Sequence, residues 1–169
     1  RREGQLTLLL KNSEIKSLLS PHELINELKD GFENYSITRN INGQRANSPL
    51  PNDKSSSMII FPALLKKISA YTVKVHAKFQ YQSPAIKGVI HLHDLNNGNL
   101  LSIMDSPYLT GVRTGLSGAL GTHILSRSNA SRVTINGCGV QGELQLRSLS
   151  YFRNISKVYA FDSIPEKAR

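Results

Sequence analysis

The sequence of 169 residues predicts an α/β fold, and three patterns support that prediction. Residues 20–37 place apolar side chains at helical spacing. Residues 57–106 contain several β-branched or alternating segments that are typical of strands. Residues 132–152 read as a short strand, a glycine-rich turn and the start of a helix. Mixed strands followed by a β-α-β unit favour a mixed α/β domain and then the beginning of a second, parallel domain.

The elements near the N-terminus follow from local signals. Residues 6–10, "LTLLL", form a short apolar run that predicts a strand. Ser20 and Glu23 match the S-x-x-E capping box, and Pro21 occupies the first helical position. Residues 39–57 are polar and rich in Asn, Pro and Ser. They predict a loop or an irregular edge.

Four further strands are predicted, over residues 57–64, 70–79, 87–95 and 100–106. A turn containing Gly98 joins the last two into a hairpin. Ser106 and Pro107 predict the start of a helix, although the four glycines that follow weaken it in isolation. This helix therefore needs tertiary support, and its glycines would allow close packing or the close approach of a ligand. A change in composition near Ser128 divides the chain into two predicted domains, residues 1–127 and 128–169.

Composition narrows the classes of partner. The formal net charge of +9 could indicate a nucleic-acid partner. The basic residues are scattered, however, and no aromatic residues are interleaved with them, so we expect no nucleic acid. No apolar run of about 18 residues predicts a membrane span. The single cysteine, Cys138, excludes an internal disulfide framework and favours the cytoplasm. The chain begins without Met and ends in the helix-like "SIPEKAR", so we expect a fragment of a longer protein.

The stretch "RVTINGCGVQGELQL" carries the most specific signal. Gly137, Gly139 and Gly142 form a G-x-G-x-x-G pattern directly after a short apolar strand. Such glycines suit a tight turn, the approach of backbone to a pyrophosphate, and close helix–strand packing. Asp162 follows 20 residues after Gly142, at the end of another predicted strand, where an acid binds the adenosine ribose. The pattern predicts a Rossmann-type dinucleotide site that prefers NAD to NADP, and Cys138 is interpreted as an incidental filler of the loop.

Four pieces of the sequence together resemble the ornithine cyclodeaminase/mu-crystallin family. They are "YTVKVHAKF", "GVIHLHDLNNGNLLSIMDSPYLTGVRTGLSGAL", "INGCGVQGELQL" and "VYAFDSIPEKAR". The resemblance implies a mixed α/β substrate and dimerisation domain, followed by a Rossmann domain of which this chain carries the first β-α-β unit. It also implies a homodimer and hydride transfer at the α-carbon of a small amino acid or cyclic imine.

The resemblance assigns roles to individual residues. Lys74 matches the family lysine that lies near the substrate and exchanges protons with it. Arg113 matches the arginine that binds the substrate carboxylate beside the cofactor, and Thr114 lies beside the nicotinamide. Arg45 matches, less closely, a second arginine for the carboxylate. The implied cofactor-binding residues are Arg113, Thr114, Gly137, Gly139, Val140, Gln141, Gly142 and Asp162.

The residue types suit these roles. A guanidinium offers a planar two-donor fork for a carboxylate. A lysine in a partly buried strand can exchange protons with an amine or imine. Without the resemblance, the better interpretations would be a solvent-facing strand lysine at Lys74 and a surface ion pair at Arg113.

Several activities fit these residues. The first is an NAD-dependent amino-acid cyclodeaminase that converts ornithine to proline and ammonia. The alternatives are an NAD(P)H-dependent reductase of a cyclic ketimine such as pyrroline-2-carboxylate, an alanine-dehydrogenase-like oxidoreductase, and a non-catalytic, mu-crystallin-like binding protein. The acidic catalytic residue of the family lies well beyond the glycine loop, so we expect the general acid/base after Arg169.

The histidines of the predicted strands are candidate metal ligands. His91 and His93 share one face of their strand, but no third ligand is identifiable, so a structural pair is favoured over a zinc site and no metal is expected. His76 shares the strand face of Lys74. It either lines the substrate pocket or packs in the strand, and packing is favoured.

Overall fold

The computed structural model describes residues 6–38, 45–51, 53–65, 68–79, 82 and 84–169. Its α/β architecture has a six-stranded mixed sheet, a separate two-stranded parallel sheet and four α-helices. The chain forms two compact units. The first contains the described residues up to Leu19 and from Gly31 to Leu109, and the second contains residues 20–30 and 110–169. Among the described residues, no helix is both long enough and apolar enough to cross a membrane.

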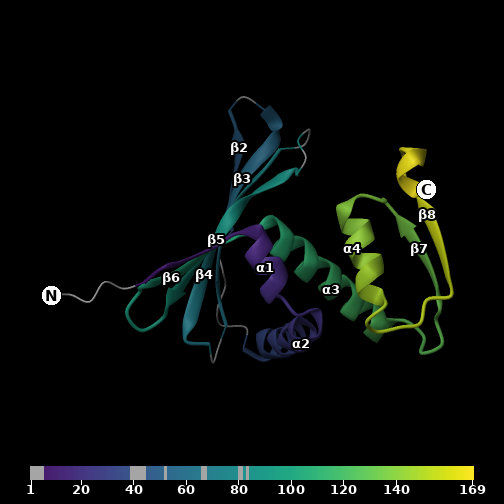
Figure 1. The fold of residues 1–169 in the computed structure, drawn as a ribbon, viewed down its shortest axis with the longest axis horizontal. Helices are drawn as coiled ribbons and strands as arrows, with labels where there is room; N and C mark the ends of the chain where they lie inside the picture. Colours follow the sequence, from purple (N-terminus) through teal and green to yellow (C-terminus); the bar gives the residue numbers. More distant parts are fainter. Residues whose placement is uncertain (1–5, 39–44, 52, 66–67, 80–81, 83) are drawn as a thin grey trace. The chain divides into compact units, whose positions relative to one another are not determined.

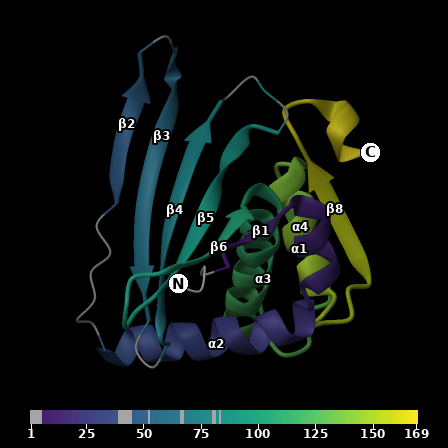
Figure 2. The ribbon, with the colours of Figure 1, turned by 60° about the vertical axis from the view of Figure 1, so that its left-hand side comes forward.

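The six-stranded sheet forms the body of the first unit. Its strands are β1 (Leu8–Leu10), β2 (Ala46–Leu50), β3 (Asp53–Leu64), β4 (Ala70–Lys78), β5 (Ile86–Asp94) and β6 (Leu100–Asp105). Figure 2 shows them side by side in the order β1-β6-β5-β4-β3-β2. Strands β2 to β6 pair antiparallel with their neighbours, and β1 pairs parallel with β6. The predicted strands and the β5–β6 hairpin are confirmed, and the turn between those strands contains Gly98 with a φ of 74°.

One predicted region has more regular structure than its sequence suggested. Residues 46–50 form the edge strand β2, which pairs with β3 and shifts register between Pro49 and Leu50. Residues 53–56 also belong to β3, although the predicted strand begins only at residue 57. Pro49 is compatible with an edge strand because one side of such a strand lacks a pairing partner. The interpretation as an irregular edge is therefore correct, and the loop interpretation is wrong for these segments.

Helices lie between and after the strands in sequence order. They are α1 (Asn12–Leu18), α2 (Pro21–Thr38), α3 (Pro107–Leu125) and α4 (Val140–Leu149), and a short 3-10 helix, η1 (Pro165–Ala168), lies near the C-terminus. The predicted start of α2 is confirmed, since the Glu23 backbone N–H donates to the Ser20 hydroxyl at 3.4 Å. Helix α1 was not predicted. It lies beside β6 on one side of the six-stranded sheet, whose other side bears no helix of the first unit among the described residues (Figure 1).

The second unit is built on a β-α-β unit. Strands β7 (Arg132–Asn136) and β8 (Lys157–Phe161) pair in parallel, and α4 connects them. Helices α3 and α4 approach very closely: a Cβ added at Gly115 would lie 2.8 Å from the Leu144 carbonyl oxygen and 2.9 Å from the Ser148 hydroxyl. This confirms the expected close packing of the helix glycines. Leu116 on α3 and Leu149 on α4 are 1% and 4% exposed, so both belong to the core.

Candidate nucleotide-binding site

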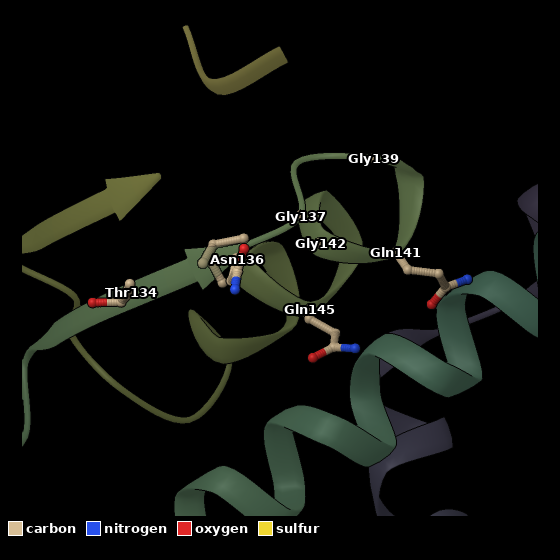
Figure 3. Close-up of a pocket in the computed structure, with 8 residues that line it drawn as sticks. Thr134, Asn136, Gly137, Gly139, Gln141, Gly142 and Gln145 are labelled. Atoms are coloured by element: carbon tan, nitrogen blue, oxygen red, sulfur yellow. The ribbon is translucent and has the colours of Figure 1, made fainter. Parts of the chain in front are cut away.

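The glycine turn follows directly from the end of β7. Gly137 has a φ of 95°, a backbone conformation that side chains disfavour. Its N–H donates to the carbonyl oxygen of Phe161 at 2.8 Å, which ties the turn to the last residue of β8. Gly139 then serves as the N-cap of α4 with an extended backbone. The chain thus reverses sharply between β7 and α4, as Figure 3 shows.

The second and third glycines of the motif serve different purposes. A Cβ added at Gly142 would collide with the carbonyl oxygen of Gly137 and lie 3.3 Å from Cγ2 of Ile135. Only glycine therefore lets α4 pack this closely on β7. A Cβ at Gly139 would meet nothing within 4 Å, so this position borders open space. Close helix–strand packing at one glycine and open access at the other match the dinucleotide-binding fingerprint.

A cavity of about 450 Å³ opens at this turn. Its volume lies within the range of small-molecule and cofactor sites. It is lined by Thr134, Ile135, Asn136, Gly137, Gly139, Gln141, Gly142 and Gln145. The amides of the first turn of α4 have no partners within the helix and, with the helix dipole, favour an anion there. Val140 begins this turn and is 71% exposed, so the N-terminus of α4 is accessible to a pyrophosphate.

Asp162 directly follows β8 and holds the glycine turn by a hydrogen bond. Its Oδ2 accepts a hydrogen bond from the Cys138 backbone N–H at 2.7 Å, and its Oδ1 accepts one from the Ile164 N–H at 2.9 Å. These two backbone hydrogen bonds, first that of Ile164 and then that of Cys138, lower the pKa of Asp162 below its ordinary value, and Lys167 adds a smaller electrostatic effect. An ionised carboxylate therefore stands at the tip of β8 beside the glycine turn. A carboxylate placed there suits ribose hydroxyls and repels a 2′-phosphate.

Cys138 contributes to this arrangement through its backbone. Its thiol lies 3.4 Å from the carbonyl oxygen of Phe161, and the residue is half-buried. The side chain is directed at the end of β8, and the Cys138 amide holds Asp162.

Arg113 and Thr114 belong to the same unit as the glycine turn. Both lie on α3, where the Arg113 side chain is exposed and the Thr114 hydroxyl donates to the carbonyl oxygen of Thr110 at 2.6 Å. The structure therefore collects all of the residues predicted to bind the cofactor in the second unit.

Lys74 and Arg45 belong to the first unit. Lys74 lies in the middle of β4, half-buried, and pairs with Phe61 of β3 and Ile90 of β5. Arg45 directly precedes Ala46, the first residue of the edge strand β2, and Ala46 pairs with Ile60, the neighbour of Phe61. Two strand spacings, roughly 10 Å, separate the lines of β2 and β4. Arg45 thus lies just before β2, next to the cross-strand row that contains Phe61 and Lys74.

The strand histidines have protein partners. The His93 ring stacks on Tyr71 with centroids 4.8 Å apart, and it meets His91 edge-on at 6.2 Å. His76 is 6% exposed and shares a hydrogen bond with the Ser106 hydroxyl. No group of three or more His, Cys, Asp or Glu side chains suited to a metal occurs among the described residues. The burial and hydrogen bond of His76 agree with its interpretation as a packed strand histidine.

Some lining residues were not singled out from the sequence. Thr134 and Asn136 are exposed, and they alternate along β7 with half-buried Val133 and Ile135. Gln145 follows Gln141 by four residues on α4, and Figure 3 shows both amides directed toward α3. Strand alternation and the i, i+4 spacing could have identified these side chains.

Comparisons with known proteins were consistent with this geometry. The family model of the ornithine cyclodeaminase/mu-crystallin family matches residues 5–169. A Delta(1)-pyrroline-2-carboxylate reductase of Bacillus cereus is 28% identical over 165 residues, which are 95% of this chain and 50% of that protein. An alanine dehydrogenase of Archaeoglobus fulgidus is 29% identical over 164 residues, 96% of this chain and 50% of that protein. The chain spans about half the length of these curated relatives.

Solved structures resemble this chain over nearly all of its length. The Delta(1)-pyrroline-2-carboxylate reductase of Thermococcus litoralis, in complex with NADH and L-proline, superimposes with a TM-score of 0.87 at 26% identity. The superimposed region covers 96% of this chain and 51% of the reductase chain. An archaeal alanine dehydrogenase dimer with bound NAD gives a TM-score of 0.82 at 27% identity, covering 96% of this chain and 50% of its own. By its sequence and its fold, the chain belongs to the ornithine cyclodeaminase/mu-crystallin family.

Proposed function

We propose that the protein is an NAD-dependent oxidoreductase acting at the α-carbon of a small amino acid or of its cyclic imine. The observation that carries the proposal is the glycine turn between β7 and α4, held by Asp162 at the tip of β8. The open side of Gly139 and the accessible N-terminus of α4 supply a place for a pyrophosphate. When bound, a nicotinamide cofactor supplies or accepts the hydride.

NAD is the proposed cofactor in preference to NADP. Asp162 is held ionised by two backbone N–H groups. A 2′-phosphate beside this carboxylate would place like charges together, whereas ribose hydroxyls would donate to it. The proteins of known structure that carry NADH or NAD support the same choice.

Three basic side chains are proposed to handle the substrate. Arg113, exposed on α3, binds the substrate carboxylate through its planar fork and lies beside the cofactor with Thr114. Arg45, at the start of β2, is proposed as the second carboxylate ligand. Lys74 is proposed to hold or transfer the proton on the substrate nitrogen, since its half-buried amine is a proton donor and acceptor of the kind that such a step needs.

Reduction of a cyclic ketimine is the preferred form of this activity. It is supported by the similarity to pyrroline-2-carboxylate reductases over 95% of the chain. Cyclodeamination of ornithine, the first activity predicted from the sequence, becomes the second candidate. It is supported by an uncharacterized cyclodeaminase of Sinorhizobium fredii, which is 30% identical over 69% of this chain and 37% of that protein. Both reactions use hydride transfer at the same carbon, so the same residues serve either.

The deciding experiment follows NADH absorbance in the purified whole protein. Adding Delta(1)-pyrroline-2-carboxylate should consume NADH and form proline. Ornithine with catalytic NAD should be tested in parallel, since proline and ammonia without net NADH would select the cyclodeaminase. Tight NADH binding with no turnover of any imine or amino acid would instead identify a mu-crystallin-like binding protein and reject the enzyme proposal.

A matched pair of variants tests the role of Lys74. Lys74→Met should abolish turnover while leaving NADH binding intact, because the proton-handling group is lost but the nucleotide site is unchanged. Lys78→Met is the control, since Lys78 lies on the same strand but is exposed at its end. Equal activities in the two variants would exclude Lys74 from the chemistry.

The domain roles and the assembly are also proposals. We assign residues 1–127 to substrate binding and dimerisation and residues 128–169 to nucleotide binding, a functional division that differs from the compact units. A homodimer is proposed through the sheet face opposite Lys74, where Met58 and Ile60 are 41% and 37% exposed. The cytoplasm is the proposed location.

A further inference from the structure

His76 and Ser106 form a buried polar pair that the proposed chemistry does not use. His76 lies on β4 and Ser106 directly precedes α3. The two residues are 6% and 0% exposed, and the Ser106 hydroxyl shares a hydrogen bond with Nε2 of the His76 ring. Burying a ring nitrogen and a hydroxyl is costly unless each is satisfied, so the pair constrains the distance between β4 and the start of α3.

Gly88 of β5 completes this constraint. It pairs with His76 across the sheet, and a Cβ added at Gly88 would collide with the Val75 carbonyl oxygen and lie 2.6 Å from Cδ2 of His76. The carbonyl oxygen of Gly88 accepts a hydrogen bond from the Ser106 N–H at 3.2 Å. Gly88 thus leaves space for the His76 ring and also binds the backbone of Ser106.

Lys74 lies two residues before His76 on β4, so both side chains leave the same face of the strand. Their pairing partners on β5, Ile90 and Gly88, are likewise two residues apart. Contacts that fix the position and twist of β4 at His76 therefore also fix the position of Lys74. The strand can transmit that position because paired strands and close-packed interiors resist small displacements.

We propose that His76 is a positioning residue for Lys74, with the Ser106 hydroxyl as its anchor. The proposal rests on the proposed function, in which Lys74 handles the substrate proton. His76 itself touches neither substrate nor cofactor. Its hydrogen bond holds β4 so that the Lys74 ammonium meets the substrate nitrogen in reactive geometry. A displacement of about 1 Å in such a group can cost roughly a hundredfold in rate.

The test compares His76→Leu, Ser106→Ala and the conservative His76→Gln in the whole protein. Glutamine can place an amide near the position of Nε2, so it should restore most of the activity. The first two variants should lower kcat by roughly ten- to a hundredfold, with little change in the Kd for NADH. His91→Gln is the control, because His91 lies on the opposite face of the neighbouring strand, and it should behave as the wild type.

A second measurement does not depend on turnover. Reductive methylation followed by peptide mass spectrometry gives the labelling of Lys74 relative to Lys78. The His76→Leu and Ser106→Ala variants should change that ratio by at least about threefold, since the Lys74 environment shifts. His76→Gln and His91→Gln should keep the wild-type ratio. A variant that fails to fold is replaced by its partner in the pair, since either one removes the hydrogen bond.

The outcomes separate this inference from the function on which it rests. If Lys74→Met is inactive but His76→Leu and Ser106→Ala keep wild-type kcat and labelling, the positioning role is wrong and the proposed function stands. If the wild type turns over no imine or amino acid, the proposed function fails. The labelling ratio then decides whether the pair still sets the environment of Lys74. Lower stability alone, with kcat and labelling unchanged, would reduce the pair to a structural contact.

Discussion

The backbone N–H of Cys138 donates to the carboxylate of Asp162 at 2.7 Å, and this bond joins the glycine turn to the tip of β8. One acid therefore shapes the turn and presents negative charge beside it. Cys138, the residue between the first two glycines of the pattern, contributes its backbone amide to this bond. Its side chain is directed at the Phe161 carbonyl.

Removing the carboxylate should weaken NADH binding. Asp162→Ala deletes both the acceptor for the ribose and the acceptor for Cys138, so the Kd for NADH should rise by about tenfold or more. The preference against NADPH should shrink in the same variant, because the like-charge repulsion is gone. Fluorescence titration measures both constants. Glu166→Gln, which changes an acid of η1, is the control and should bind as the wild type does.

The lowered pKa of Asp162 predicts a dependence of stability on pH. Because the folded-state pKa lies below the unfolded one, the carboxylate stabilises the fold at pH values above its ordinary pKa. That contribution is lost as the pH falls through the folded-state pKa. Thermal unfolding of wild type and Asp162→Asn should differ at neutral pH and converge in acid. A difference that stays constant from neutral pH into strong acid would contradict the assignment.

Gly142 and Gly121 should respond in opposite ways to alanine. A Cβ at Gly142 collides with the Gly137 carbonyl, so Gly142→Ala should distort the turn, lower the melting temperature and abolish NADH binding. A Cβ at Gly121 meets nothing within 4 Å, and the residue lies inside α3. Gly121→Ala should therefore raise the stability by up to about 1 kcal/mol. Calorimetry with a cofactor titration measures both, and equal effects would contradict the packing argument.

Arg153 should be important for the stability of the second unit. Its guanidinium donates to four carbonyl oxygens, those of His123 and Arg127 at 2.8 Å, Ser128 at 3.2 Å and Ala130 at 3.3 Å. Arg153→Ala should cost about 2 kcal/mol or more in the free energy of unfolding, since hydrogen bonds to charged groups are the stronger kind.

Arg147→Ala provides the matched comparison for Arg153. Arg147 makes an exposed i, i+4 ion pair with Glu143 at 2.9 Å. Its loss should cost about 0.5 kcal/mol or less. Denaturant unfolding of both variants gives the two values, and a cost for Arg153 no larger than that for Arg147 would be inconsistent with the carbonyl contacts.

The proposed dimer can be tested on the exposed sheet face. Ile60→Asp places a charge among exposed apolar side chains opposite the Lys74 face, and it should convert a dimer to a monomer in light scattering. Ile124→Asp changes a side chain that is 64% exposed on α3, and it should leave the assembly unchanged. A monomeric wild type, or an unaltered Ile60→Asp dimer, would exclude this interface.

Local signals explain which parts of the fold could be predicted. The start of α2 carries the S-x-x-E pattern, and the Glu23 N–H does donate to the Ser20 hydroxyl. The β7–α4–β8 unit carries its glycine pattern between a short apolar strand and a helix. Each of these patterns indicates its structure directly. Helix α1 was missed because it has only seven residues and buries only Ile15 among them, which leaves no helical period to detect. Strand β2 was ambiguous because its residues are mostly exposed and its register depends on β3.

The contacts that were missed are long-range. The hydrogen bond between His76 and Ser106 joins residues 30 apart, and Arg153 reaches His123 across the same separation. No local pattern encodes such partners, because the pairing is decided by how the elements pack. Asp162 is predicted correctly at a strand end, but its hydrogen bond to Cys138 depends on how the glycine turn packs against that strand end.

The most direct test of the central claim is a titration of the whole protein with NADH and, separately, with NADPH. We expect saturable binding of NADH that is at least about tenfold tighter than binding of NADPH, because Asp162 would accept hydrogen bonds from ribose hydroxyls and repel a phosphate. No binding of either nucleotide, or tighter binding of NADPH, would contradict it.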